Sequence, residues 1–532
     1  MKNTKLFMFA ACTLFLAACG KQTVKIMTPP DASNRILFSA EQLQTTLDKA
    51  GYQVMMQQGD TTFSDPEIKT ILLTEVNDTT LKKEGFHITT TGNLTRVCGR
   101  DGSGVIYGSR ELIDRVNDSD GKLDFPEELK DGPEMVLRGA CVGLQKMTYL
   151  PGHGVYEYPY TPESFPWFYD KEQWIKYLDM LVANRMNSLY LWNGHPFASL
   201  VKLEDYPFAL EVDEETFKKN EEMFSFLTEE ADKRGIFVIQ MFYNIILSKP
   251  FAEHYGLKTQ DRNRPITPLI ADYTRKSIAA FIEKYPNVGL LVCLGEAMCT
   301  VEDDVEWFTK TIIPGVKDGL QALGRTDEPP LLLRAHDTDC KLVMDAALPI
   351  YKNLYTMHKY NGESLTTYEP RGPWSKIHTD LSSLGSIHIS NVHILANLEP
   401  FRWGSPDFVQ KAVQAMHNVH GANALHLYPQ SSYWDWPYTA DKLPNGEREF
   451  QLDRDWIWYQ TWGRYAWNSH RDRADEIGYW NHQLGQFYGT SDENAGNIRI
   501  AYEESGEIAP KLLRRFGITE GNRQTLLLGM FM

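Results

Sequence analysis

The sequence predicts an α/β protein built on a (β/α)8 barrel, with a small α/β domain before the barrel and a helical module after it. From residue 133 to 435, apolar runs typical of strands alternate with amphipathic helical segments. Eight such units over roughly 300 residues match the size of a closed barrel. Alternation alone also fits an open doubly wound sheet. The number of units, and the acidic residues that follow several of the predicted strands, favour the barrel.

The first 19 residues predict a lipoprotein signal peptide. A basic start, Met1 to Lys5, precedes an apolar stretch from residue 6 to 18. This stretch is shorter than the roughly 20 apolar residues of a membrane span. Leu16-Ala-Ala-Cys19 resembles the bacterial lipoprotein signal, which predicts lipidation of Cys19 and a globular part on the periplasmic face or the cell surface. The alternative is an ordinary signal peptide in which a cysteine occurs by chance.

Composition limits the class of protein. The hydrophobic share of 42% excludes a mostly disordered chain. The net charge of -16 and the lack of a basic run argue against nucleic acid as a partner. The 13 tryptophans fit either large cores or platforms on which sugars stack. The cysteines and histidines lack metal-site spacing, so we expect neither a metal nor another cofactor.

Residues 24–132 predict the small α/β domain. Helical periodicity covers residues 39–50, and residues 71–74 and 85–89 have strand patterns. The glycine-rich segment 99–108 precedes a predicted helix over 109–116. Its spacing matches neither a Walker loop nor a dinucleotide fingerprint, so a tight turn with close backbone packing is favoured over a phosphate site.

The barrel occupies residues 133–435 and the helical module residues 436–532. The module has helical patterns over 454–467, 470–488 and 491–515. Helices between the strands of the barrel are expected at 171–184, 220–233, 272–285, 305–323 and 407–420. The eight predicted barrel strands cover residues 136–142, 188–192, 236–242, 288–294, 330–334, 353–358, 392–397 and 422–427.

Two glutamates stand at the ends of predicted strands. Glu296 follows the fourth strand and Glu399 follows the seventh. The C-terminal ends of barrel strands form the active-site face, and glycosidic bond hydrolysis requires a pair of carboxylates there. Glu363, after the sixth strand, is a further candidate, and Asp337 and Asp339 are weaker ones. For any single acid, the alternative is an exposed or salt-bridged carboxylate.

Cationic and aromatic residues also follow the predicted strands. Arg334 ends the fifth strand and Lys359 follows the sixth, and either could bind the carboxylate or hydroxyls of a sugar. The alternative is an ion pair that orients a catalytic acid. Trp192, Trp403 and the cluster from Tyr433 to Trp436 could stack on a sugar ring or pack within loops.

Several motifs resemble the α-glucuronidases of glycoside hydrolase family 67. The segments that carry the resemblance are Arg234-Gly-Ile-Phe-Val-Ile-Gln240, Gly289 to Glu296, Leu333-Arg334-Ala335, Lys359-Tyr-Asn361-Gly362, Asn397-Leu-Glu399 and Gly463 to Asn468. The resemblance implies that Glu296 is the general acid, that Glu399 is the base, and that Arg334, Lys359 and Asn361 bind the sugar. The N-terminal domain looks like the non-catalytic domain found in that family and in β-hexosaminidases.

The chain also departs from the family 67 pattern. Gln145 to His153 replaces a loop rich in Trp and Asp, and no lysine precedes Glu296. The aspartate expected after the Lys-Asn-Gly turn is missing, although Glu363 lies nearby. We therefore expect a distant relative with a changed sugar pocket, an exo-acting hydrolase that removes a terminal, α-glucuronidase-like uronic sugar from a polysaccharide.

Two other functions remain open. A hexosaminidase-like enzyme would need an aspartate before the acid, where this chain has Gly295. A non-catalytic glycan-binding lipoprotein would bind many glycosides without turnover. The oligomeric state, a homodimer included, is not determined by the sequence.

Overall fold

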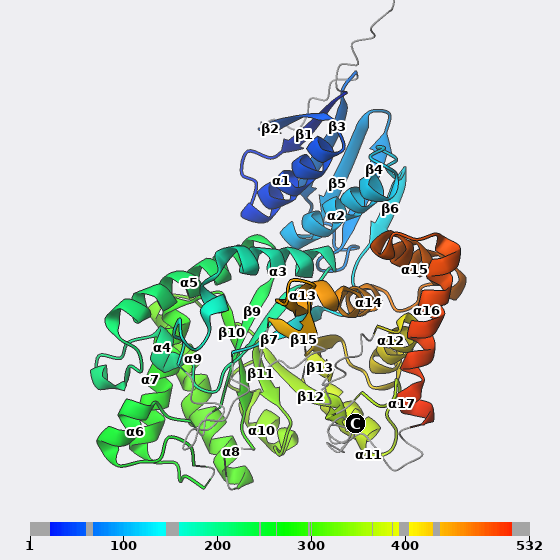
Figure 1. Ribbon diagram of the computed structural model, residues 1–532. Helices are drawn as coiled ribbons and strands as arrows, with labels where there is room; N and C mark the ends of the chain where they lie inside the picture. Colours follow the sequence, from blue (N-terminus) through cyan, green and yellow to red (C-terminus); the bar gives the residue numbers. More distant parts are fainter. Residues whose placement is uncertain are drawn as a thin grey trace, which may run out of the picture.

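The computed structural model places a small domain against one end of a barrel, with a helical module along the side of both (Figure 1). The residues that the structure describes are 22–59, 67–144, 159–243, 246–261, 263–295, 298, 300–363, 365–385, 387–392, 404–428 and 437–512. Of Glu363, Ala440 and Asp441 only the backbone is described.

The barrel is closed and parallel, as the alternation of strands and helices predicts. Around the barrel the strands follow the order β10-β11-β12-β13-β14-β7-β8-β9. Every residue of β8 and β10 is buried, because helices cover the outside and side chains fill the inside. The strands are β7 (Leu137–Gly143), β8 (Ser188–Trp192), β9 (Phe237–Tyr243), β10 (Val288–Cys293), β11 (Leu331–Arg334), β12 (Leu354–Glu363), β13 (Ile387–Val392) and β14 (Ala424–Leu427).

The helices that cover the barrel begin at side-chain caps in several cases. Asp170, Asp213 and Thr267 each accept a hydrogen bond from a backbone N–H of the helix that follows. These helices are α3 (Lys171–Ala183), α5 (Glu214–Lys233), α7 (Pro268–Lys284), α8 (Val301–Trp307), α9 (Ile313–Ala322), α10 (Cys340–Ala347), α11 (Pro373–Ser382) and α12 (Pro406–Gln414). Shorter elements are α4 (Phe197–Leu200), α6 (Lys249–Tyr255), η1 (Pro166–Tyr169), η2 (Pro207–Ala209) and the π-helical turns η3 (Phe308–Ile312) and η4 (Ala415–Val419).

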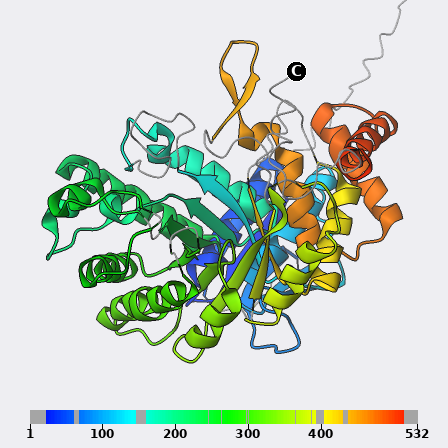
Figure 2. The same ribbon diagram turned by 90° about the horizontal axis from the view of Figure 1, so that it is seen from below.

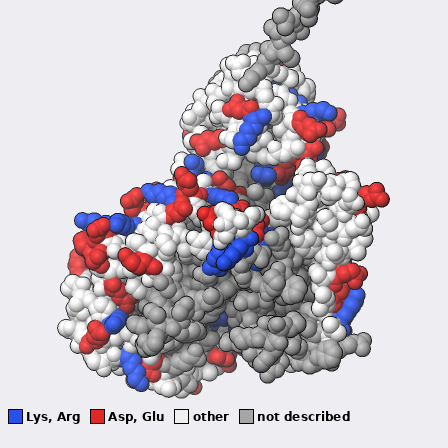
Figure 3. All heavy atoms as spheres, viewed as in Figure 1, with Lys and Arg blue, Asp and Glu red and all other residues white. Residues whose placement is uncertain are grey.

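Charges of both signs are interspersed on the outside of these helices (Figure 3). On α5, Lys219 pairs with Glu215 one turn earlier, and Lys202 and Lys171 pair with Glu214 and Glu222. Exposed pairs of this kind stabilise a fold by at most about 1 kcal/mol each. They keep the surface solvated rather than define a site.

Strands six and seven differ from the prediction. The seventh strand is Ile387–Val392, so it ends where the sequence pattern suggested that it begins. The observed strand pairs with β12 on one side and β14 on the other, and this pairing sets its place in the barrel. The sixth strand is longer than predicted and ends at Glu363. The predicted helix 305–323 begins earlier and is interrupted by η3.

The N-terminal domain is a six-stranded sheet in the order β2-β1-β3-β5-β4-β6 with two helices. The predicted glycine-rich turn at 99–108 is wrong, because residues from Gly102 onward form the first turns of a helix. A Cβ at Gly104 would lie 2.3 Å from the carbonyl oxygen of Gly85, so glycine permits the helix to approach the sheet. The elements are β1 (Thr23–Thr28), α1 (Asn34–Lys49), β2 (Gln53–Gln58), β3 (Lys69–Glu75), β4 (Phe86–Thr91), β5 (Leu94–Gly99), α2 (Gly102–Asp118) and β6 (Glu128–Asp131).

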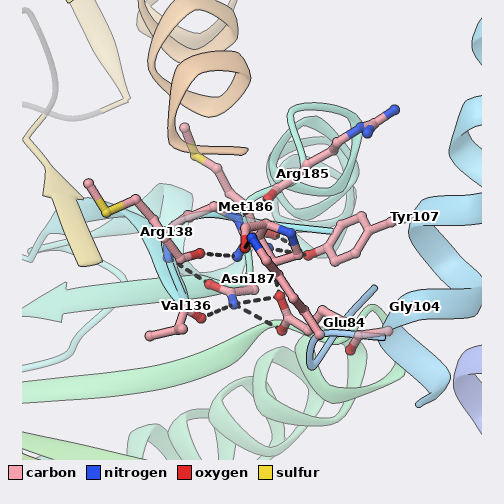
Figure 4. A network of polar contacts seen from close by, with 12 residues as sticks. Glu84, Gly104, Tyr107, Val136, Arg138, Arg185, Met186 and Asn187 are labelled. Carbon is pink, nitrogen blue, oxygen red and sulfur yellow. Dashed lines mark hydrogen bonds and ion pairs between the residues drawn. The ribbon is translucent and has the colours of Figure 1, made fainter. Parts of the chain in front are cut away.

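A buried polar network joins this domain to the end of the barrel where the strands begin (Figure 4). Arg138 of β7 is completely buried and donates to Glu84 at 2.7 Å, to the carbonyl of Arg185 at 2.7 Å and to the carbonyl of Met135 at 2.7 Å. The side-chain amide of Asn187 donates to both oxygens of Glu84 at 2.9 and 3.0 Å. The charge on Arg138 and the charge on Glu84 are therefore both compensated inside the protein.

The C-terminal module packs against the barrel and the N-terminal domain. The backbone N–H groups of Glu134 and Met135 donate to the carbonyls of Trp467 and Ala466, and the indole of Trp467 donates to Asp131 at 2.8 Å. The expected helices are present: α14 (Trp456–Trp467), α15 (Arg473–Tyr488) and α16 (Asp492–Gly506), with short turns α13 (Gln451–Arg454) and α17 (Ile508–Lys511).

One expectation for this region is wrong. Strands do not end with the barrel, since β15 (Tyr438–Lys442) and β16 (Arg448–Phe450) form an antiparallel hairpin. Figure 2 shows this hairpin projecting away from the barrel. Its strands are too short and polar for the alternation of apolar residues to reveal them. Among the described residues, no helix combines the length and the apolar character that crossing a bilayer requires.

Candidate active site

The inside of the barrel becomes polar toward the end where the strands finish. Lower down, Tyr190, Ile239, Leu291 and Met357 fill the interior. At the last strand positions the same inward alternation places Trp192, Tyr243, Cys293 and Arg334. The C-terminal end of the barrel therefore presents aromatic and cationic side chains above an apolar core, which is where barrel enzymes have their active sites.

Arg334 lies at this mouth with only 4% of its surface exposed. Its Nη1 donates to the Tyr243 hydroxyl at 3.3 Å and to the Cys293 sulfur at 3.5 Å. Its Cζ lies 5.1 Å from the centre of the Trp192 ring. These contacts hold the guanidinium plane in one orientation while the group keeps its full charge.

Aromatic rings form a wall beside Arg334. Trp192 meets Tyr243 edge to face at 5.9 Å and meets Tyr428 at 5.6 Å. The backbone carbonyl of Tyr428 accepts a hydrogen bond from the indole of Trp458, so the C-terminal module supports this wall. Below it, Tyr190 stacks on His426 with ring centres 3.6 Å apart. Trp192 is the last residue of β8, at the barrel mouth, and its stacking on a sugar stays a prediction.

The long strand β12 brings further polar groups to the same mouth. Tyr355 and Met357 face the interior, and Lys359 and Asn361 follow on the same side of the strand at two-residue spacing. Lys359 is 6% exposed, and the amide of Asn361 donates to the Thr366 hydroxyl at 2.8 Å. The predicted substrate-binding residues Arg334, Lys359, Asn361 and Trp192 thus lie around one opening.

Asn391 of β13 also lies at this mouth, although the sequence patterns did not indicate it. It pairs in register with Lys359 on one side and with His426 on the other. Its side chain is completely buried, and neither amide atom has a hydrogen-bond partner among the described residues. A buried amide without partners is costly, which makes Asn391 a candidate for binding a ligand hydroxyl. An asparagine within the strand Ile387–Val392 was the signal that could have revealed it.

The backbone just before Glu296 is tightly confined. The N–H of Gly295 donates to the Thr338 hydroxyl at 3.0 Å. A Cβ at Gly295 would lie 1.8 Å from the carbonyl oxygen of Asp337, and Asp337 itself has a left-handed φ of 51°. The loop after β11 therefore leaves room only for glycine at this position.

The predicted catalytic and anchoring side chains lie outside the described residues. This applies to Glu296, Glu399, Trp403, the cluster Tyr433 to Trp436 and Cys19, while the backbone of Glu363 ends β12. β13 is described up to Val392, and Glu399 belongs to a segment outside the described residues, so its catalytic role stays a prediction.

Asp339, one of the two weaker candidates, has a structural role. Asp339 caps α10 by accepting from the backbone N–H of Leu342 at 3.1 Å. Burial lowers the pKa of His195 to about 3 and that of His358 to about 4, so both are neutral at physiological pH. In the part of the chain that is described, no three His, Cys, Asp or Glu side chains are placed to hold a metal ion.

Two solved hexosaminidase structures share the fold. The structure of β-N-acetylhexosaminidase from Bacteroides fragilis NCTC 9343 is 13% identical, with a TM-score of 0.53 over 90% of this chain and 94% of that one. The Flavobacterium johnsoniae chitobiase is 12% identical, with a TM-score of 0.54 over 93% of this chain and 71% of that one. At such low identity the likeness concerns the arrangement of domains alone.

A third structure is far more similar. It is a GH138 enzyme that targets the pectin rhamnogalacturonan II, with 75% identity and a TM-score of 0.91 over 95% of this chain and 72% of that chain. The protein is therefore a glycosidase with a polysaccharide substrate. The chain belongs to glycoside hydrolase family 138. No protein-family model and no curated protein sequence matches it. A relationship to family 67 is not shown.

Proposed function

We propose that this glycosidase is exo-acting and removes a terminal uronic sugar from a pectic polysaccharide. The observation that supports the uronic sugar is the buried Arg334 at the barrel mouth, with Lys359 on the next strand. The Arg334 guanidinium has its Cζ 5.1 Å from the centre of the Trp192 ring, and a guanidinium can present two parallel N–H donors to the two oxygens of a carboxylate. The acidic character of pectin fits this pocket, and pectin is what the GH138 relative targets.

We propose Glu296 as the general acid. It follows β10 by three positions, at the end of the barrel where Arg334 lies. An apolar strand before it favours the protonated carboxyl, which a general acid requires. Because Gly295 tolerates no side chain, the backbone that leads to Glu296 has one available path.

Glu363 is the better-supported partner of Glu296. It is the last residue of β12, two positions beyond Asn361, so its backbone stands at the barrel mouth, whereas Glu399 lies outside the described residues. As the second carboxylate, Glu363 would act as base or nucleophile. Glu399 remains the alternative for this role.

Glutamine variants test these assignments with aryl glycosides of galacturonic and glucuronic acid and of the neutral sugars. Glu296→Gln and Glu363→Gln should each reduce kcat by roughly 10²–10⁴-fold or more, since a general acid or base typically contributes that much. Glu399→Gln serves as the matched comparison and should retain most of the activity. Loss of activity in Glu399→Gln with normal activity in Glu363→Gln would exchange their roles. Faster turnover of neutral glycosides than of uronides would refute the uronic substrate.

We also propose that Cys19 carries a lipid anchor that keeps the enzyme on a bacterial membrane, outside the cytoplasm. The apolar stretch followed by Leu16-Ala-Ala-Cys19 supports it. Metabolic labelling with a fatty-acid analogue should mark the wild type and not Cys19→Ala. Equal labelling of both proteins would rule out lipidation at this residue.

A further inference from the structure

A second cleft lies at the opposite end of the barrel from Arg334. It has a volume of about 720 Å³ and is bounded by α2, the end of α3, and helices α14 and α15. Figure 1 shows these helices converging where the N-terminal domain meets the C-terminal module. Asn184 and Arg185, which line it, directly precede β8, so the cleft opens where the barrel strands begin.

Three arginines in the wall of this cleft lie close to one another. Arg185 pairs with Glu111 at 2.7 Å, and Arg464 makes a two-pronged pair with Glu476 at 2.7 and 2.6 Å. Arg471 is different. No carboxylate among the described residues forms an ion pair with it, and its Nε is buried without a hydrogen-bond partner.

The surroundings of Arg471 disfavour an uncompensated charge. Partial burial lowers the pKa of Arg471, and the neighbouring cations Arg464 and Arg185 lower it further, while Glu476 and Asp131 raise it. The group still remains charged at neutral pH, since an arginine cannot lose its proton under those conditions. Arg471 is partly buried, and a cation beside other cations is stabilised by a nearby anion. Glu476 is engaged with Arg464 and Asp131 with Arg185, so a further negative charge would be favourable beside Arg471.

The rest of the cleft suits the hydroxyl groups of a sugar. Side-chain amides line it, and Gln460 donates to the Tyr479 hydroxyl at 2.8 Å and to Gln483 at 2.9 Å. On the α2 wall, Asp118 is available to accept a hydroxyl, and acids there would repel a second carboxylate. The two sides of the cleft therefore differ: the α2 side carries carboxylates that accept hydrogen bonds, and the other side carries Arg471, which has no ion-pair partner among the described residues. The remaining amides are Asn117, Asn184 and Gln486.

We propose that this cleft is a second, non-catalytic site that binds a carboxylate-bearing saccharide. Arg471 pairs with the carboxylate, and the amides of Gln460 and Gln483 bind the hydroxyls. The choice of an acidic saccharide rests on the proposed function, because a pectin-degrading enzyme meets such groups repeatedly along its substrate. A second site would hold the polymer on the enzyme between cleavage events.

Titration calorimetry with a galacturonic acid trimer tests the proposal. The Glu296→Gln background prevents turnover. The wild-type cleft should give a second binding event beside that of the barrel mouth, and Arg471→Gln should weaken only this event, by roughly tenfold or more. Arg471→Lys, which keeps the charge and loses the planar fork, should fall between the two. Arg96→Gln is the matched control, since it removes the same charge from an exposed position of β5 outside the cleft.

Two further ligands identify what the site recognises. The trimer with its carboxyl groups reduced to alcohols should lose the second event, and inorganic phosphate should bind much more weakly than the trimer. Equal binding of the reduced trimer, or equally tight binding of phosphate, would overturn the proposed acidic saccharide. An unchanged second event in Arg471→Gln would overturn the site itself.

This design separates the two proposals. Arg334→Met should remove binding at the mouth and leave the event that depends on Arg471. Arg471→Gln should leave kcat and KM for a small aryl uronide unchanged, because that substrate does not reach the cleft. Circular dichroism and Tm confirm that each variant is folded. A defect in the small substrate for Arg471→Gln would refute a separate site.

Discussion

Two buried arginines at opposite ends of the same barrel differ in the groups that surround them. Arg138, at the base, has partners on each guanidinium nitrogen: the carbonyls of Arg185 and Met135 and the side chains of Glu84 and Tyr107. Arg334, at the mouth, contacts a phenol, a thiol and an indole ring. The first guanidinium is enclosed by a carboxylate and backbone carbonyls at the base, whereas aromatic and sulfur neighbours orient the second at the barrel mouth, where we propose that it meets the substrate. Burial alone therefore does not distinguish a structural arginine from a binding one; the neighbours do.

The largest effect on stability is expected at the base. Arg138→Met leaves Glu84 buried without its cation, which should lower the free energy of unfolding by roughly 3–5 kcal/mol. Chemical denaturation measures this loss. Activity per folded molecule should change little, because Arg138 lies at the far end of the barrel from the mouth. The double variant with Glu84→Gln should recover part of the stability, and a stability equal to that of the wild type in Arg138→Met would contradict the structural role.

Replacing Arg334 at the mouth by methionine should have the opposite effect: a large loss of activity and little change in stability. Arg334→Met should reduce kcat/KM for uronides by roughly 100-fold, since a charge-assisted hydrogen bond contributes about 1.5–3 kcal/mol. Stability should change by less than about 1 kcal/mol, because methionine retains most of the packing against Trp192. Steady-state kinetics on uronides and on neutral glycosides give the comparison. An equal loss on both substrates would mean that Arg334 does not bind a carboxylate.

Acidic pH should destabilise the side of the barrel that is formed by β12, β13 and α11. His378 and His388 are buried between β12, β13 and α11, with facing ring nitrogens 2.8 Å apart. Burial lowers the pKa of His388 to about 3 and that of His358 to about 4, and it lowers the pKa of His378 as well.

The sign of the pH effect follows from these directions. In the unfolded chain these histidines take up protons near pH 6.5, whereas in the folded protein they stay neutral to much lower pH. Stability is therefore complete above about pH 6.5 and falls as the pH approaches 4, by about 1.4 kcal/mol per pH unit for each histidine. His388→Gln should flatten a plot of Tm against pH in this range. An unchanged slope would assign the acid sensitivity to other groups.

The smallest effect is expected at Asp339. Asp339→Ala removes the cap of α10 and should cost about 1 kcal/mol of stability, with kcat unchanged. Asp345→Ala is the matched control, because Asp345 lies within the same helix, pairs with the exposed Lys341 and is not the cap residue. Thermal denaturation and kinetics on both variants separate the roles. A strong loss of kcat in Asp339→Ala would restore Asp339 as a catalytic candidate.

The sequence by itself determined the architecture of the barrel. Its strands are covered by helices outside and filled by side chains inside, so Val288 to Cys293 and Ser188 to Trp192 are continuous apolar runs that a pattern can reveal. It also indicated Arg334, Lys359, Asn361 and Trp192 as candidates for sugar binding, because each stands at or just beyond the end of such a run. These inferences depend only on local order along the chain.

Only the tertiary structure decided the strand register and the charge partners of the buried side chains, because both depend on residues far apart in the sequence. The place of β13 follows from its pairing with β12 and β14, which sets Asn391 in register with Lys359 and His426. The role of Arg138 required Glu84, 54 positions away in the sequence. The lack of an ion-pair partner for Arg471 among the described residues could be seen only in the folded protein, where α2, the end of α3 and the segment from α14 to α15 meet around one cleft. A charge is compensated, or left for a ligand, by groups that only folding brings within a few ångströms.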